Sequence, residues 1–304
     1  MHQAYLQISQ EENEKRFNRK HIDGYIREAI TTDAVMLEKI AHGVQLINEL
    51  VNGDYYASKM VRMAQLKALD IEPLVVDVFV GIAYCLREEL FTSVTAQIAS
   101  RLRFSDKTEA ITTTAEIVAV LCNTDAFDIC KPHKMASLSV ISRIPLSDKL
   151  LTFIEESQYL PPMVVEPLEL INNFSSGYLT HNDSLILGSG NHHDGDICLD
   201  VLNLMNRVEL SLDLDFLCKV EENPSHALDS NDKKEQWMHF KKQSYRFYDL
   251  MQSQGNVFHL THKVDKRGRI YAQGYHITTQ GSAFKKAMIE LANPEYIEGV
   301  PLHG

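Results

Sequence analysis

The sequence predicts a mainly helical α+β protein, because the pattern of its residues changes along the chain. Through the first 130 residues apolar side chains recur at helical spacing, as at Ile40, Val44 and Ile47. From about Leu138 shorter runs rich in Val and Ile alternate with proline and glycine, which predicts strands and turns. The 304 residues, 44% apolar and 23% charged, suffice for one large globular domain or two ordinary ones.

Helices are expected where the apolar spacing is helical and a local signal starts or stops it. Asp106 or Ser105 would cap the helix that begins at Lys107, and Ser147 another. Gly255-Asn256 would end the last long helix. The expected helices cover residues 32–51, 55–69, 73–89, 93–102, 107–123, 147–156, 196–212 and 233–254.

Strands and extended segments are expected between these helices. Residues 137–144 predict a strand that ends at Pro145, and the proline-bounded run 161–167 predicts extended chain. Turn residues flanked by aliphatic positions predict a β-hairpin over about 172–189, with its tip near Thr180–Asp183. Residues 257–264 follow a Gly-Asn breaker and predict a further strand.

Composition and motifs argue against several classes of protein. No apolar run approaches the ~18–20 residues of a membrane span, and Met1–Lys20 lacks the apolar core of a secretory signal, so we expect a cytoplasmic protein. The five cysteines are scattered, which favours reduced thiols over a zinc site or disulfide framework. The sequence contains no Walker A loop, nucleophile elbow or Rossmann fingerprint, so hydrolase or dehydrogenase functions based on those motifs have no support.

Charge is distributed unevenly in this acidic chain. The net charge is −11, yet residues 231–290 carry eleven Lys and Arg against five Asp and Glu. This asymmetry predicts one basic face for a polyanion, although ordinary solvated helix faces remain the alternative. Near residues 241–248 bases and aromatics interleave, and there we favour a helix that packs its aromatics inward and shows its lysines to water.

Residues 265–271 carry the strongest chemical signal. A glycine between two arginines allows a phosphodiester chain to approach the backbone closely. Arg269 offers a planar fork for phosphate, and Asp265 can orient an arginine. Tyr271 could stack on a base or sugar. The segment therefore predicts a clamp for a nucleic-acid backbone, with a basic surface turn as the alternative.

This segment resembles the phage and mitochondrial single-subunit DNA-dependent RNA polymerases. Their D/T-x-x-G-R motif sits on a strand. It is followed by an apolar residue and commonly a Tyr, and then by a Gly-containing loop and a helix. The corresponding features here are Asp265-x-x-Gly268-Arg269, Ile270-Tyr271, Gln280-Gly281, Lys286 and a helix end at Leu291-Ala292. The resemblance is specific over residues 257–294, weaker over 161–189, and absent from the first 60 residues.

The resemblance implies a helical amino-terminal domain over residues 1–230, with the hairpin at 172–189 inserted at the edge of the DNA bubble. Residues 231–304 would hold a basic helix and the first strand and helix of the polymerase palm. The implied nucleic-acid contacts are Arg267, Gly268, Arg269, Tyr271 and Lys286, with Asp265 orienting the clamp. The implied bubble-edge residues are Gly177, Tyr178, Thr180, His181 and Asn182.

The resemblance also implies that catalysis needs a second chain. The family's two metal-binding aspartates and its fingers lysine lie well beyond the motif, and this sequence ends 35 residues after Arg269. We therefore expect no catalytic or metal-binding residue here, and an inactive isolated chain. Two Mg²⁺ ions would be bound by a partner chain carrying palm and fingers. The chain would be either a truncated piece or, preferably, the smaller subunit of a split, heterodimeric phage polymerase.

The expected partners follow from that assignment. They are the second polymerase subunit, template DNA, the RNA–DNA hybrid and a single-stranded-DNA-binding or accessory factor. No membrane partner is expected, and a phage-encoded chain would work in the host cytoplasm.

Two other functions remain open on the sequence. One is a non-enzymatic helical module that binds DNA or protein, in which the D-x-x-G-R motif is a surface turn. The other is a metal-dependent phosphohydrolase that uses His192, His193 and Asp194 in the loop 191–196, because these are metal-ligand residue types. For that loop a solvated turn is the default interpretation.

Overall fold

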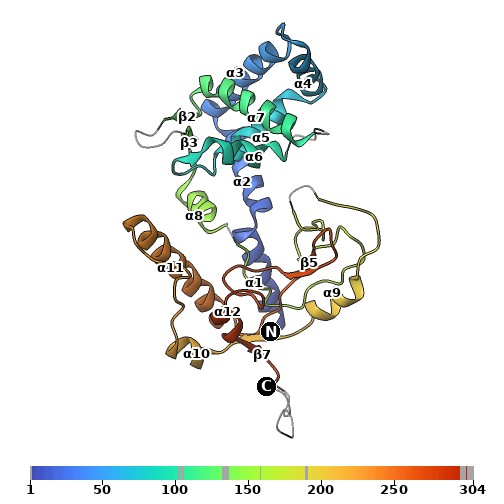
Figure 1. The fold of residues 1–304 in the computed structure, drawn as a ribbon, viewed down its shortest axis with the longest axis vertical. Coiled ribbons are helices and arrows are strands. Elements are labelled where there is room, and N and C mark those ends of the chain that lie inside the picture. Colours follow the sequence, from blue (N-terminus) through green and yellow to red (C-terminus); the bar gives the residue numbers. More distant parts are fainter. Residues whose placement is uncertain are drawn as a thin grey trace. The chain divides into compact units, whose positions relative to one another are not determined.

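The computed structural model describes residues 2–101, 104, 106–131, 137–157, 159–188, 191–294 and 299. It divides the chain into two compact units, one made of residues 1–18 and 157–304 and the other of residues 19–156. Helices dominate the described residues, and the strands pair in small antiparallel sheets (Figure 1). The predicted mainly helical α+β class is confirmed. None of the described helices combines the length and apolar character that crossing a bilayer requires.

The unit of residues 19–156 is a helical bundle with one small sheet. Its apolar core centres on α5, whose side chains from Leu74 to Ile82 are nearly all buried. The helices are α2 (Arg19–Thr32), α3 (Ala34–Val51), α4 (Ala57–Lys67), α5 (Ile71–Ile82), α6 (Phe91–Ala99), α7 (Lys107–Leu121) and α8 (Asp148–Glu156), with a 3-10 turn η1 (Cys122–Thr124). The antiparallel sheet has the order β1 (Glu89–Leu90), β3 (Ser139–Ser142), β2 (Phe127–Cys130).

Polar side chains start several of these helices as the sequence predicts. The Asp106 carboxylate accepts a hydrogen bond of 2.8 Å from the backbone N–H of Glu109, whereas the alternative cap, Ser105, lies outside the described residues. The Ser147 hydroxyl accepts one of 3.3 Å from Leu150 at the start of α8. The helix predicted over 73–89 is wrong at its end, because α5 stops at Ile82 and the chain turns into β1.

The unit of residues 1–18 and 157–304 combines separate helices with short strand pairs. A core of aromatic and aliphatic side chains joins α1, α11 and the strand β4. The helices are α1 (His2–Phe17), α9 (Leu199–Asn206), α10 (Leu214–Lys219), α11 (Asn231–Ser253) and α12 (Ala283–Ala287). The strands are β4 (Leu210–Leu212) paired with β7 (Ile289–Leu291), and β5 (His262–Val264) paired with β6 (Ile270–Ala272). The predicted domain boundary at residue 230 falls inside this unit and stays a prediction.

Two predicted helix ends are wrong in this unit. The helix expected over 196–212 ends at Asn206, and residues 210–212 form β4 instead. The helix expected to reach Leu291-Ala292 ends at Ala287, and residues 289–291 form β7. The two strands pair antiparallel with Leu210 opposite Leu291. This pairing satisfies backbone groups of segments about 80 residues apart, so tertiary contact overrides the helical pattern.

The prediction of a β-hairpin over 172–189 is also wrong, because the described residues 172–188 contain no strand pair of their own. The side chains of this segment bind its own backbone instead. The Asn172 side chain accepts a bond of 2.8 Å from the N–H of Phe174, and the Ser176 hydroxyl one of 3.2 Å from Tyr178. Such local bonds compete with a ladder. Ile186 makes a single parallel bridge to Val264 in β5.

Candidate nucleic-acid interface

The D-x-x-G-R motif forms the tight turn between β5 and β6. The strands pair antiparallel, with Val264 opposite Ile270. Across the turn the N–H of Asp265 donates to the carbonyl of Arg269 at 2.9 Å, and the N–H of Gly268 donates to the carbonyl of Asp265 at 2.9 Å. Gly268 has φ +82°, which favours glycine, and a Cβ there would meet no atom within 4 Å. The turn therefore leaves its backbone open to approach.

The Asp265 carboxylate organises this turn. One oxygen accepts the backbone N–H groups of Arg267 at 2.9 Å and Arg269 at 3.0 Å. The other accepts the Nη2 groups of both arginines, at 2.9 and 2.8 Å, their Nε groups, and the Tyr271 hydroxyl at 3.3 Å. The Asp265 side chain is 15% exposed, whereas those of Arg267 and Arg269 are 69% and 53% exposed. One shielded carboxylate thus orients two exposed cations.

The electrostatics of the turn leave it positive. Burial opposes the charge on Asp265, but hydrogen bonds from Arg269 and the charge of its guanidinium lower the pKa of Asp265 below its ordinary value. The hydrogen bond to Asp265 raises the pKa of Arg269. The Lys266 ammonium, the two guanidinium groups and the one carboxylate give residues 265–271 a net charge of about +2. The Arg269 guanidinium carbon also lies 5.7 Å from the centre of the Tyr271 ring.

The predicted contact Lys286 lies on the exposed face of α12. The loop before that helix is tied to β6, because the Gln280 side chain accepts the N–H of Ala272 at 3.0 Å and donates to the carbonyl of Ile270 at 3.2 Å. Within the described residues no hydrogen bond or ion pair links Lys286 to the 265–271 turn. Its role in binding nucleic acid stays a prediction.

The Glu14 side chain of α1 binds the loop that contains the predicted bubble-edge residues. Its fully buried carboxylate accepts the N–H groups of Leu179 at 3.0 Å and Thr180 at 2.8 Å, the Thr180 hydroxyl, and the Gln10 amide at 2.8 Å. Burial alone would raise the pKa of Glu14, but the hydrogen bonds from His181, Thr180, Gln10 and Leu179 outweigh it and lower this pKa to about 2. No local signal marks this role of Glu14, because the loop residues that it binds lie about 165 residues away.

The other predicted bubble-edge residues are also mostly packed inward. The Tyr178 hydroxyl accepts a bond of 3.2 Å from Thr261, and its ring stacks on His181 with centroids 4.9 Å apart. Burial raises the pKa of Tyr178 to about 12. Gly177 has φ +74° and is buried, whereas Asn182 is exposed. The segment is a folded loop anchored on α1, and its role at a DNA bubble stays a prediction.

The His/Asp loop 191–196 does not assemble a set of metal ligands. The His192 Nε2 lies 3.3 Å from a carboxylate oxygen of Asp194. The Asn173 amide binds the carbonyls of His193 and Gly195, at 2.8 and 2.7 Å, and so fixes the loop through its backbone. Over the part of the chain that the structure covers, no three His, Cys, Asp or Glu side chains gather as metal ligands would. The phosphohydrolase alternative gains no support here.

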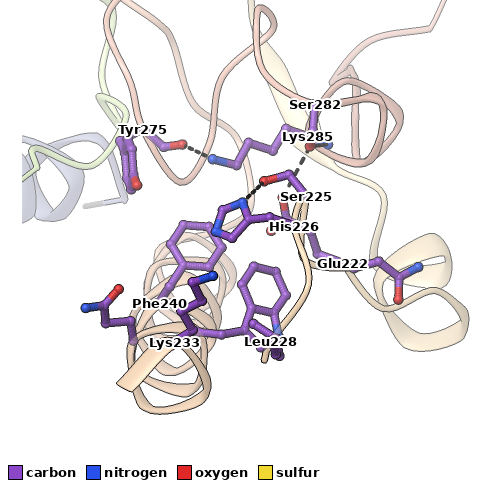
Figure 2. Close-up of a pocket in the computed structure, with 12 residues that line it drawn as sticks. Glu222, Ser225, His226, Leu228, Lys233, Phe240, Tyr275, Ser282 and Lys285 are labelled. Atoms are coloured by element: carbon purple, nitrogen blue, oxygen red, sulfur yellow. Dashed lines mark hydrogen bonds between the residues drawn. The ribbon is translucent and has the colours of Figure 1, made fainter. Parts of the chain in front are cut away.

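The first half of α11 is largely exposed, whereas its second half packs inward. Phe247 and Tyr248 are buried and Tyr245 is 36% exposed, so the predicted inward packing is confirmed for two of the three rings. Beside the exposed half lies a pocket of about 430 Å³ that the sequence did not reveal (Figure 2). Its walls come from α11, from residues 222–228 and from residues 275–285.

Comparison with known proteins supports one relationship. No protein-family model matches the chain. The chain is similar to a protein of Gelasinospora sp. (strain G114) named "Probable DNA-directed RNA polymerase", with 28% identity over 144 residues. That match covers 43% of this chain and only 17% of the fungal protein, so the chain spans a small part of the relative's length. Together with the motif on the β5–β6 turn, the similarity supports a relationship between this chain and DNA-directed RNA polymerases.

Proposed function

We propose that this chain is part of a DNA-directed RNA polymerase and that the 265–271 turn holds the sugar-phosphate backbone of the template or the RNA–DNA hybrid. The observation that carries the proposal is the Asp265 carboxylate, which orients the exposed Arg267 and Arg269 side chains. The similarity to the fungal polymerase supports the same class of function.

The geometry suits a phosphate in two respects. Each guanidinium uses its Nε and Nη2 groups for Asp265, and its Nη1 group makes no hydrogen bond to any described residue. Arginines already fixed by Asp265 lose less conformational entropy when they bind a ligand. The open space above Gly268 lets a strand come close to the turn. Tyr271 then lies beside Arg269, where a base or sugar could pack.

We further propose a division of labour between two chains. This chain would contribute the amino-terminal domain and the clamp, and a partner chain would contribute the palm carboxylates and the fingers, as in a split phage polymerase. The two Mg²⁺ ions bound by the partner would neutralise charge on the attacking and leaving oxygens. The residues of this chain would act by positioning the template or hybrid. The alternative, a non-enzymatic nucleic-acid-binding module, would use the same turn without such a partner.

The test is Arg269→Ala in the assembled polymerase. We expect elongation to fall roughly 100-fold, because a misplaced template slows a step that depends on alignment. Association of the subunits should be unchanged, as measured by gel filtration. Arg207→Ala is the matched control, because Arg207 is 52% exposed and pairs with Glu166 rather than with a residue of the turn. Unimpaired elongation by Arg269→Ala would overturn the proposed role.

Co-expression with neighbouring open reading frames separates the two functions. A polymerase subunit should co-purify with a chain that bears the palm aspartates, and the complex should extend an RNA primer on a DNA template. A chain that binds nucleic acid but recruits no such partner would favour the non-enzymatic module.

A further inference from the structure

The pocket on the first half of α11 has aromatic walls from two separate segments. The rings of Trp237 and Phe240 stack at 5.3 Å with an interplanar angle of 23°. Tyr275 meets Phe240 edge-on at 5.9 Å and stacks on Tyr159 at 3.8 Å. Tyr275 remains 41% exposed, so it is held in place and still accessible. Flat rings of this kind offer stacking surfaces to a planar ligand.

Cations and hydrogen-bonding groups surround these rings. The Lys285 amine lies 4.7 Å from the Tyr275 ring centre and 5.2 Å from that of Phe240, and it donates to the Tyr275 carbonyl at 2.6 Å (Figure 2). Lys233 also lines the pocket and is paired with Asp229 at 2.8 Å. Hydroxyl, amide, imidazole and carboxylate groups complete the lining, from Ser225, Ser282, Asn223, Gln236, His226 and Glu222.

We propose that this pocket binds a single unpaired nucleotide. Its volume of about 430 Å³ lies within the ~300–1,000 Å³ that small-molecule sites occupy. The base would stack on the ring of Trp237 and meet Tyr275 at its edge, because Phe240 lies nearly parallel to Trp237 and nearly perpendicular to Tyr275. The phosphate would lie near the amines of Lys233 and Lys285. A purely apolar ligand would use neither amine, and an acidic peptide would leave the aromatic rings unused.

The pocket also lies close to the turn along the chain. Tyr275 follows Tyr271 by four residues, so their Cα atoms are at most about 14 Å apart. At the ~3.4 Å rise per nucleotide of a duplex strand, that distance corresponds to about four nucleotides. A strand packed on Tyr271 at the end of the turn could therefore supply the nucleotide. This choice of source rests on the proposed function, whereas the nucleotide chemistry rests on the pocket alone.

The experiment uses Trp237, which is the single tryptophan of the chain and reports directly on the pocket. The emission of the full chain is followed during titration with short oligo(dT), oligo(U) and UMP. We expect saturable quenching, because a base stacked on the indole alters its emission. A midpoint at least about tenfold lower for an oligomer than for UMP assigns the site to a strand, and equal midpoints assign it to a free nucleotide. The two oligomers separate DNA from RNA.

The Tyr275→Leu variant removes one aromatic ring from the lining of the pocket and keeps Trp237 as the fluorescent reporter. The midpoint of quenching should rise about tenfold, because one aromatic contact with the base is lost. Tyr245→Leu is the matched control, since Tyr245 lies on α11 outside the pocket, is similarly exposed, and should leave the midpoint unchanged. Absence of quenching by all three ligands, or an unchanged midpoint in Tyr275→Leu, would overturn the proposal.

The failure of this inference can be told apart from failure of the proposed function. If the clamp hypothesis is wrong, Arg269→Ala leaves elongation intact while quenching of Trp237 by UMP persists. If the pocket hypothesis is wrong, Arg269→Ala still slows elongation, and labelled oligonucleotides bind the chain without changing its tryptophan emission.

Discussion

Two loops in the same unit are each built around one carboxylate, and they use it in opposite ways. Asp265 lies just under the surface and holds the exposed side chains of Arg267 and Arg269. Glu14 is fully buried and accepts backbone N–H groups of Leu179 and Thr180. The first arrangement leaves cations available to a ligand, and the second uses all its donors within the fold. The partners of the two carboxylates thus distinguish a turn with exposed cations from a structural anchor.

The largest expected effect is the loss of Glu14. In Glu14→Ala two partly buried N–H groups lose their acceptor, each at about 1–3 kcal/mol, so the free energy of unfolding should fall by about 2–6 kcal/mol. Urea unfolding followed by tryptophan emission measures this, because Trp237 belongs to the same unit. Glu11→Gln, on the exposed side of α1, is the control and should change little. A small effect of Glu14→Ala would remove the distinction between the two carboxylates.

The pH dependence of stability sharpens the same contrast. The pKa of Glu14 is about 2 in the folded chain and near 4.5 ordinarily, so its ionised form stabilises the fold above about pH 4.5. This contribution, about 3 kcal/mol, should disappear as pH falls from about 4.5 through 2. Glu14→Gln should flatten that loss. Burial lowers the pKa of His276 to about 4, so protonation of this residue destabilises the fold as pH falls from about 6.5 to 4. The Glu14→Gln variant should still show this second loss of stability. Tryptophan-detected unfolding at graded pH checks both windows.

Asp265→Asn should affect binding more than folding. The amide can still accept the backbone N–H groups of the turn, but it loses the charge that holds both guanidinium groups. We expect affinity for a labelled oligonucleotide to fall roughly tenfold, measured by fluorescence anisotropy. The urea midpoint should stay close to that of the unaltered chain. A large loss of stability with unchanged affinity for the oligonucleotide would show that Asp265 stabilises the fold, as Glu14 does, and does not serve binding.

The smallest effect is expected at a helix cap in the other unit, where a carboxylate accepts a single N–H group. Asp106→Ala should lower the stability of that unit by about 1 kcal/mol. Far-UV circular dichroism is the appropriate measurement, because the unit of residues 19–156 contains no tryptophan. A cost as large as that of Glu14→Ala would show that the number of donors does not set the effect.

The sequence predicted the elements whose signals are local. The Asp106 cap and the α11 helix each depend on residues within a few positions, and the structure has both. The sequence offered a surface turn at Gly268 only as the alternative to a clamp, and the chain does turn there. The orienting role of Asp265 follows from the same short motif. The contacts of these residues with nucleic acid stay predictions.

Features that depend on distant partners could not be predicted. Strand β4 forms because it pairs with β7 about 80 residues later, and each has only three residues, too few for a clear pattern. The Glu14 side chain binds backbone N–H groups near the tip of the expected hairpin from about 165 residues away, and no local pattern reveals this contact. The pocket at Trp237 likewise joins three separate segments.

The order of the chain also bears on how the protein matures during synthesis. Residues 1–18 belong to the same unit as residues 157–304, so α1 leaves the ribosome before about 140 residues that build the other unit. At 5–20 residues per second, roughly 8 to 33 s pass between the synthesis of Glu14 and that of its partners at 179–181. During that interval the bundle of residues 19–156 can complete its own folding. Translation speed through this interval therefore sets how long a nascent amino-terminal helix stays unpaired and open to chaperones.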